Sequence, residues 1–142
     1  MFVAPVMPRD HESLTPARRA VLAAEILAAY AVVRWELRGG DVMRALSHAR
    51  RHRPPTDRPA DRLGGARLGF AVGRILRRLP AKSPCLTQSL VLTRLLARRG
   101  LSSSLVLGVS PGHELAAHAW VEHGGAPLLP AYDRMFARLV EL

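Results

Sequence analysis

The chain has 142 residues, of which 49% are hydrophobic, and a formal net charge of +10. This composition is typical of a folded protein and excludes an intrinsically disordered chain. The single cysteine excludes an internal disulfide and a Cys-rich metal site, and it fits a cytoplasmic protein. We expect no metal and no cofactor. We also expect no stable membrane insertion, because the most apolar segment, residues 20–33, is short and is interrupted by Glu25.

The positive charge is concentrated in the first half of the chain. Residues 1–80 contain 15 arginines and seven acidic residues, whereas residues 81–142 contain six basic and four acidic residues. An arginine-rich half indicates an acidic partner, which could be a peptide, a nucleic acid or a membrane surface. No aromatic stacking motif interleaves the basic residues, which argues mildly against nucleic acid. The alternative is that the arginines reflect a GC-rich genome and form a solvated surface.

The first predicted helix begins after Thr15, because a threonine followed by Pro16 is typical of an N-cap and a first helical residue. It runs to Arg38 and stops at Gly39-Gly40. The helix is apolar on most of its circumference. We therefore expect it to be either the central helix of the fold or a surface that binds a partner.

Two more helices are predicted in the first half. Asp41 can cap a second helix over residues 42–52, and three prolines make residues 53–62 a loop. A third helix is predicted over residues 63–80 and ends at Pro80. Its glycines weaken the helix or allow close packing; they are Gly64, Gly65, Gly69 and Gly73.

The second half begins with a helix from residue 84 to Arg99, which Gly100 ends. Its predicted buried face comprises Leu86, Leu90, Val91, Leu92 and Leu95. Strands then follow over residues 101–109, 115–123 and 126–133, and Gly124-Gly125 predicts a hairpin between the last two. The order predicts a single α+β domain, helical over about 14–80 and with a helix followed by antiparallel strands over about 81–142.

Cys85 stands out because it begins the fourth predicted helix. The unpaired N–H groups and the dipole of a helix N-terminus favour an anion, which makes the site suitable for a reactive thiolate. The same N–H groups could hold the oxyanion of a tetrahedral intermediate. The alternative is a buried cysteine that serves only in packing.

A cysteine nucleophile needs a base, commonly a histidine that a carboxylate orients. Among six histidines, His118 lies within a predicted strand, where a rigid element could aim it; the alternative is a histidine of the core. A two-residue turn places His118 opposite Ala131 and makes Asp133 its diagonal neighbour on the same face. Glu122 shares that face but lies about 13 Å along the strand. We therefore favour Asp133 over Glu122 as the orienting carboxylate.

The sequence around these residues resembles a known family. The segments "SPCLTQSLVLTRLLARRGLSSSLVLGV" and "AHAWVE" resemble the standalone B proteins of lasso-peptide biosynthesis, leader peptidases of the transglutaminase-like cysteine protease superfamily. The resemblance is close from about Leu79 and looser over the helical first half. It implies a helical region packed on a papain- or transglutaminase-like core. It also implies that Cys85 is the nucleophile, His118 the base and Asp133 their orienting partner.

The same resemblance implies an activity, which is proteolytic removal of the leader from a ribosomally made precursor. It implies three partners: the leader of the lasso precursor, a separate leader-recognition protein and an ATP-dependent cyclase that closes the macrolactam. From the uneven charge, we expect the arginine-rich helices and the 53–62 loop, including Arg50, Arg51 and Arg53, to form a docking surface for the leader, its recognition protein or both.

Two further residues have predicted roles. Gln88, one turn after Cys85, could support the oxyanion, or it could be a surface or packing residue. Trp120 could shield the imidazole or line a substrate groove, or it could be a core residue. Three other functions stay open from the sequence: acyl transfer to an amine by the same triad, a basic non-catalytic binding module with a structural Cys85, and a structural chaperone for the cyclase.

Overall fold

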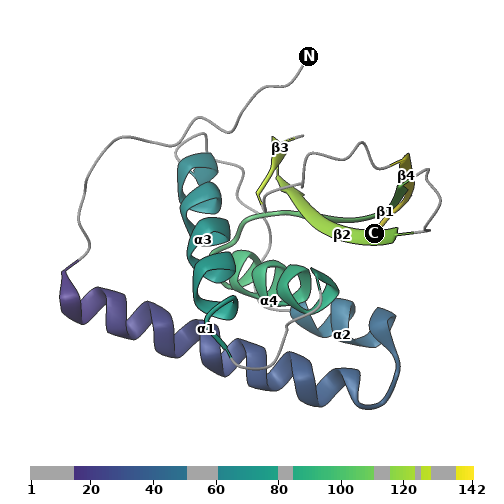
Figure 1. Ribbon diagram of the computed structural model, residues 1–142. Helices are drawn as coiled ribbons and strands as arrows, with labels where there is room; N and C mark the ends of the chain where they lie inside the picture. The colour runs from purple at the N-terminus through teal and green to yellow at the C-terminus, as the bar shows by residue number, and fades with distance from the viewer. Residues whose placement is uncertain (1–14, 51–60, 80–84, 111–115, 124–125, 129–136) are drawn as a thin grey trace.

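The computed structural model describes residues 15–50, 61–79, 85–110, 116–123, 126–128 and 137–142. These residues form four helices that precede four strands in the chain. The elements are α1 (Pro16–Leu37), α2 (Val42–Ala49), α3 (Asp61–Leu76), α4 (Cys85–Arg98), β1 (Ser104–Ser110), β2 (Ala116–His123), β3 (Ala126–Pro127) and β4 (Ala137–Glu141). Figure 1 shows the helices grouped on one side of the sheet, with α4 between the sheet and α1. The predicted α+β class is confirmed.

The first two helices begin at the predicted caps. The Thr15 hydroxyl accepts a hydrogen bond from the N–H of Arg18, and the Asp41 carboxylate accepts one from the N–H of Arg44 at 3.0 Å. Gly40 follows α1 with a φ of 74°, a conformation that glycine adopts without steric cost. Helix α2 ends at Ala49, earlier than predicted.

The central helix of the fold is α4, and the prediction that α1 could take this position is wrong. Helix α4 packs against α1, α2, α3 and both central strands. It is buried on nearly every side, and even Ser89 and Thr93 have no exposed surface. Of its predicted buried face, Leu86 is half-buried, whereas the other four residues are fully buried: Leu90, Val91, Leu92 and Leu95.

Helix α4 ends as the sequence predicts. Gly100 has a φ of 74°, and its N–H donates to the carbonyl of Ala97. The N–H of Leu101 donates to the carbonyl of Leu96 at 3.0 Å. These two bonds are those of a Schellman motif, which satisfies the last carbonyls of the helix and turns the chain toward β1.

The sheet is antiparallel and has the strand order β3-β2-β1-β4. Strand β1 is central, and the paired residues Leu105 and Val121 have no exposed surface. The sequence-based prediction missed β4, which pairs with β1 on the edge away from β2. Of the predicted strand over residues 126–133, β3 covers Ala126–Pro127 and Leu128 lies in a bend, while residues 129–133 lie outside the described part of the chain.

Helix α3 covers Asp61–Leu76, whereas the prediction gave residues 63–80. The last two residues of the predicted loop, 61 and 62, therefore belong to the helix. At its other end the helix stops at Leu76, and residues 77–79 form a turn before Pro80. Gly69 shows why α3 contains glycines. A Cβ at Gly69 would overlap the backbone oxygen of Leu128 and lie 3.0 Å from its carbonyl carbon, so a glycine here allows close packing.

None of the described helices has the length and apolar character that crossing a membrane requires. The buried side chains of α4 join those of α1, α2, α3 and the central strands in one hydrophobic cluster. The first residue of α4 is thus held by a well-packed helix, and this residue is Cys85.

Candidate active site

Cys85 lies at the start of α4, and its side chain is half-buried. Its Sγ accepts a hydrogen bond of 3.3 Å from the backbone N–H of Ala119 on β2. Among the described residues, β3 pairs with β2 at Glu122 and His123, nearer the end of the strand than Ala119. The thiol therefore lies against the strand residue that directly follows His118.

His118 lies on β2, opposite Gly108 of β1, and its side chain is half-buried. Its imidazole stacks on the Trp120 ring, with the two ring centres 6.0 Å apart and the planes inclined by 23°. Burial lowers the pKa of His118 from its ordinary value of 6.5, because desolvation disfavours the charged ring. A neutral imidazole at neutral pH can accept a proton, as a base must.

Two other described histidines are engaged away from Cys85. His48 lies 3.2 Å from the Glu36 carboxylate, and His123 Nδ1 lies 2.5 Å from the backbone oxygen of Ser102. Three more lie outside the described residues: His11, His52 and His113. Of the histidines that the structure describes, His118 is the one that directly precedes the residue whose N–H bonds to the thiol.

The predicted register of the β2–β3 hairpin is confirmed. Glu122 pairs with Pro127 and His123 with Ala126, which leaves two residues for the turn. The N–H of Leu128 continues the same register by donating to the carbonyl of Val121 at 2.8 Å. Ala131 and Asp133 lie outside the described residues, so the role of Asp133 stays a prediction.

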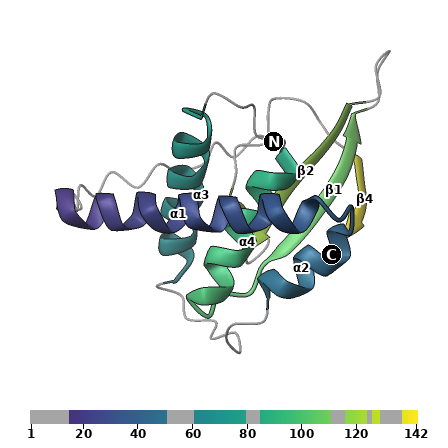
Figure 2. The ribbon, with the colours of Figure 1, turned by 90° about the horizontal axis from the view of Figure 1, so that it is seen from below.

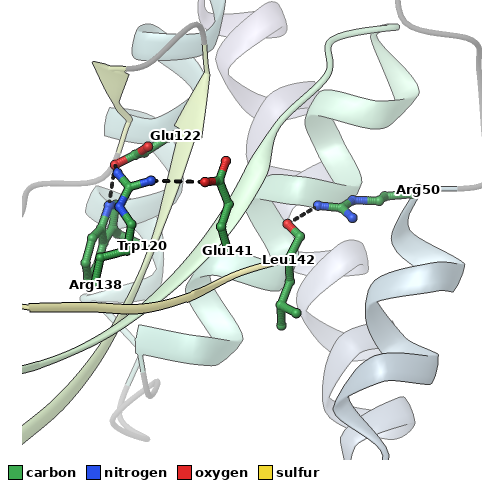
Figure 3. A network of polar contacts seen from close by, with 6 residues as sticks. All are labelled: Arg50, Trp120, Glu122, Arg138, Glu141 and Leu142. Atoms are coloured by element: carbon green, nitrogen blue, oxygen red, sulfur yellow. Dashed lines mark hydrogen bonds and ion pairs between the residues drawn. The ribbon is translucent and has the colours of Figure 1, made fainter.

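Glu122 has a different setting from that of an orienting carboxylate. Its Oε1 accepts a hydrogen bond of 2.9 Å from the indole Nε1–H of Trp120. The same oxygen accepts one of 2.7 Å from Nη2 of Arg138, whose Nη1 donates to Glu141 at 3.1 Å (Figure 3). The hydrogen bond to Glu122 and its negative charge are the leading causes that raise the pKa of Arg138. Glu122 thus fixes the indole that stacks on His118.

A β-bulge makes this network possible. Arg138 and Glu141 are three residues apart, and in a regular strand their side chains would point to opposite faces. The register between β1 and β4 shifts between Leu107 and Gly108, which brings both side chains to the same face. Gly108 pairs with both His118 and Arg138, and it contributes no side chain between them.

Sequence reasoning missed Arg138 because it missed β4. Trp120 lies on the His118 face, as predicted, but only 8% of its surface is exposed. Its ring therefore serves mainly in packing against its neighbours. Gln88 lies on α4 one turn after Cys85 and is half-buried, and its predicted contact with an oxyanion stays a prediction.

A comparison with protein-family models shows which family the chain belongs to. Residues 26–141 match the model of the transglutaminase-like superfamily, and this match includes all of α2, α3, α4 and the described sheet. The chain belongs to the transglutaminase-like superfamily. This superfamily includes cysteine peptidases and acyltransferases. No curated protein and no solved structure gave a significant match.

Proposed function

We propose that this member of the transglutaminase-like superfamily is a cysteine peptidase that removes the leader from a ribosomally made lasso-peptide precursor. The observation that carries the proposal is the hydrogen bond from Ala119 to the Cys85 sulfur. It joins the start of the central helix to the strand residue next to His118, so a candidate nucleophile and a candidate base come from two rigid elements.

In the proposed mechanism, His118 takes the proton of the Cys85 thiol, and the resulting thiolate attacks the carbonyl carbon of the bond between leader and core. The electron pair of the carbonyl moves to its oxygen, which the N–H groups of the first turn of α4 can stabilise. The tetrahedral intermediate collapses when the protonated His118 gives its proton to the leaving amine. The core is released, and the leader remains on Cys85 as a thioester.

Hydrolysis of the thioester completes the reaction. His118 takes a proton from water, whose oxygen attacks the thioester carbonyl, and the leader leaves with a new carboxylate. An amine in place of this water would give acyl transfer instead. We assign to Asp133 the role of orienting the imidazole. The chain from Arg138 through Glu122 to Trp120 then supports the imidazole from its stacked side.

The substrate is inferred from the resemblance of the segments around Cys85 and His118 to the lasso B proteins. The same resemblance supports the partners: a separate leader-recognition protein and an ATP-dependent cyclase. The docking surface predicted for the arginine-rich helices and the 53–62 loop stays a prediction. One nitrogen of the Arg50 guanidinium donates to the backbone oxygens of Ser103 and Leu142, and Figure 3 shows the second contact, so Arg50 links the end of α2 to residues that flank the sheet. Arg51 and Arg53 lie outside the described residues.

The experiment combines the chain with a lasso precursor and a leader-recognition protein and follows the products by mass spectrometry. We expect separate leader and core products, and no cleavage with Cys85→Ala or with His118→Ala, because the two groups act as one unit. Asp133→Asn should retain less activity than wild type through loss of imidazole orientation. Circular dichroism of each variant checks that it folds.

Reaction in water enriched in ¹⁸O separates the two superfamily activities. A peptidase incorporates one ¹⁸O atom into the new leader carboxylate, whereas acyl transfer gives a leader linked to an amine without it. A folded Cys85→Ala protein that still cleaves the precursor would overturn the proposal.

A further inference from the structure

The outer face of α1 carries an apolar stripe that no other described element covers. Of the seven large hydrophobic side chains that are exposed in the described part of the chain, four lie on α1. They include Val21 and Trp35, which are 68% and 72% exposed. In Figure 2 the helix lies across the near side of the molecule with its outer face uncovered.

The stripe has the spacing of a helix–helix seam. Six exposed apolar residues recur at alternating steps of four and three, which is the heptad pattern that one helix presents to another. Alanines at four of these positions allow a close approach, and Val21 and Trp35 supply larger side chains. The six residues, which we call the outer stripe, are Ala17, Val21, Ala24, Ala28, Ala31 and Trp35.

The charges around the outer stripe select the partner. The two acidic residues of α1 face inward. Glu25 pairs at 3.0 Å with Arg99, which directly follows α4, and Glu36 pairs at 3.8 Å with Arg94 of α4. The exposed charges that remain on and directly after the helix are all positive; they are Arg18, Arg19, Arg34 and Arg38. A helix lying along the outer stripe would therefore be favoured by carboxylates on its flanks.

A second copy of this chain does not fit the stripe. In either orientation, two α1 helices would bring arginines against arginines, which is unfavourable. The stripe is about 27 Å long at 1.5 Å per residue, so one helix of about that length would cover it. A single amphipathic helix of another protein matches both the size and the charge.

We propose that the outer stripe of α1 binds an amphipathic helix of a partner protein, whose apolar seam is flanked by aspartate and glutamate. Trp35 is the anchor of this interface, because a large exposed aromatic ring gains most from burial. The proposal goes beyond the peptidase activity, since the stripe lies on α1 and Cys85 lies on α4. Binding should accordingly be the same in the Cys85→Ala protein.

The test uses two synthetic helical peptides with the same Leu/Ala seam, stapled so that both are helical. One carries glutamate on its flanks and the other carries lysine. We expect the glutamate peptide alone to bind in fluorescence anisotropy and to shift the emission of Trp35, since the other tryptophan, Trp120, is already buried. Added salt should weaken this binding.

Two variants with the same kind of change complete the test. Ala28→Glu places a charge within the outer stripe and should weaken binding by about tenfold or more. Phe70→Glu changes a residue of α3 that is 48% exposed and should leave binding unchanged. Equal binding of the lysine peptide, no binding of either peptide, or full binding by Ala28→Glu would each overturn the proposal. A wild-type dimer that Ala28→Glu dissociates in sedimentation would do so as well.

Discussion

Substitution of two glycines of α3 should have opposite effects on stability. At Gly69 a Cβ would overlap the backbone oxygen of Leu128, whereas a Cβ at Gly73 would have nothing within 4 Å of it. Replacing a helical glycine by alanine stabilises a helix by about 1 kcal/mol. Gly73→Ala should therefore stabilise the protein by about this amount. At Gly69 the overlap is with backbone, which cannot rotate away, and overpacking of this kind costs about 1–3 kcal/mol.

The net result for Gly69→Ala is a loss of up to roughly 2 kcal/mol once the helical gain is subtracted. The two variants should thus differ by about 1–3 kcal/mol in free energy of unfolding. Urea denaturation followed by circular dichroism measures this difference, and with a slope of about 2 kcal/mol per molar urea the midpoints should lie about 1 M apart. Equal midpoints for the two variants would refute the packing of α3 against Leu128.

Three further predictions concern the site and its support. Glu122→Ala removes the acceptor of the Trp120 indole N–H, so it should lower the free energy of unfolding by about 1–3 kcal/mol and also lower kcat. Glu122→Gln keeps an acceptor and should retain more stability and more activity. Equal effects of the two variants in thermal unfolding and in precursor cleavage would contradict this. The NMR titration of His118 should have its midpoint below 6.5, because burial lowers this pKa. The unfolded chain then binds the proton more tightly than the folded one, so His118 should reduce stability as the pH falls from 6.5 through the folded-state pKa. A midpoint above 6.5 would contradict the burial of the ring. Arg50→Gln should lower the urea midpoint and leave KM for the precursor unchanged, because the contacts of Arg50 are internal. A raised KM in a fully stable variant would instead indicate that Arg50 helps to bind the precursor.

The features that the sequence predicts well depend on local interactions. Thr15, Asp41 and Gly100 end or begin helices through bonds to residues only a few positions away. The register of the β2–β3 hairpin follows from the two residues between its strands. Cys85 could be selected because it begins a helix.

The features that the sequence does not predict depend on distant parts of the chain. Strand β4 is short, and its pairing with β1 joins segments some thirty residues apart. The link from Arg138 to Glu122 further requires a bulge, which no local pattern announces. The apolar circumference of α1 could mean a central helix or a partner surface, and only the burial of α4 shows that the central helix is another one.

The central claim is that Cys85 attacks the precursor and carries the leader as a thioester. Because Cys85 is the only cysteine, rapid acid quenching followed by intact-protein mass spectrometry tests this claim most directly. We predict an adduct of the mass of the leader on the wild-type chain during turnover, located on Cys85 and absent from Cys85→Ala. Cleavage that proceeds without any adduct on the wild type, and continues in Cys85→Ala, would contradict the account.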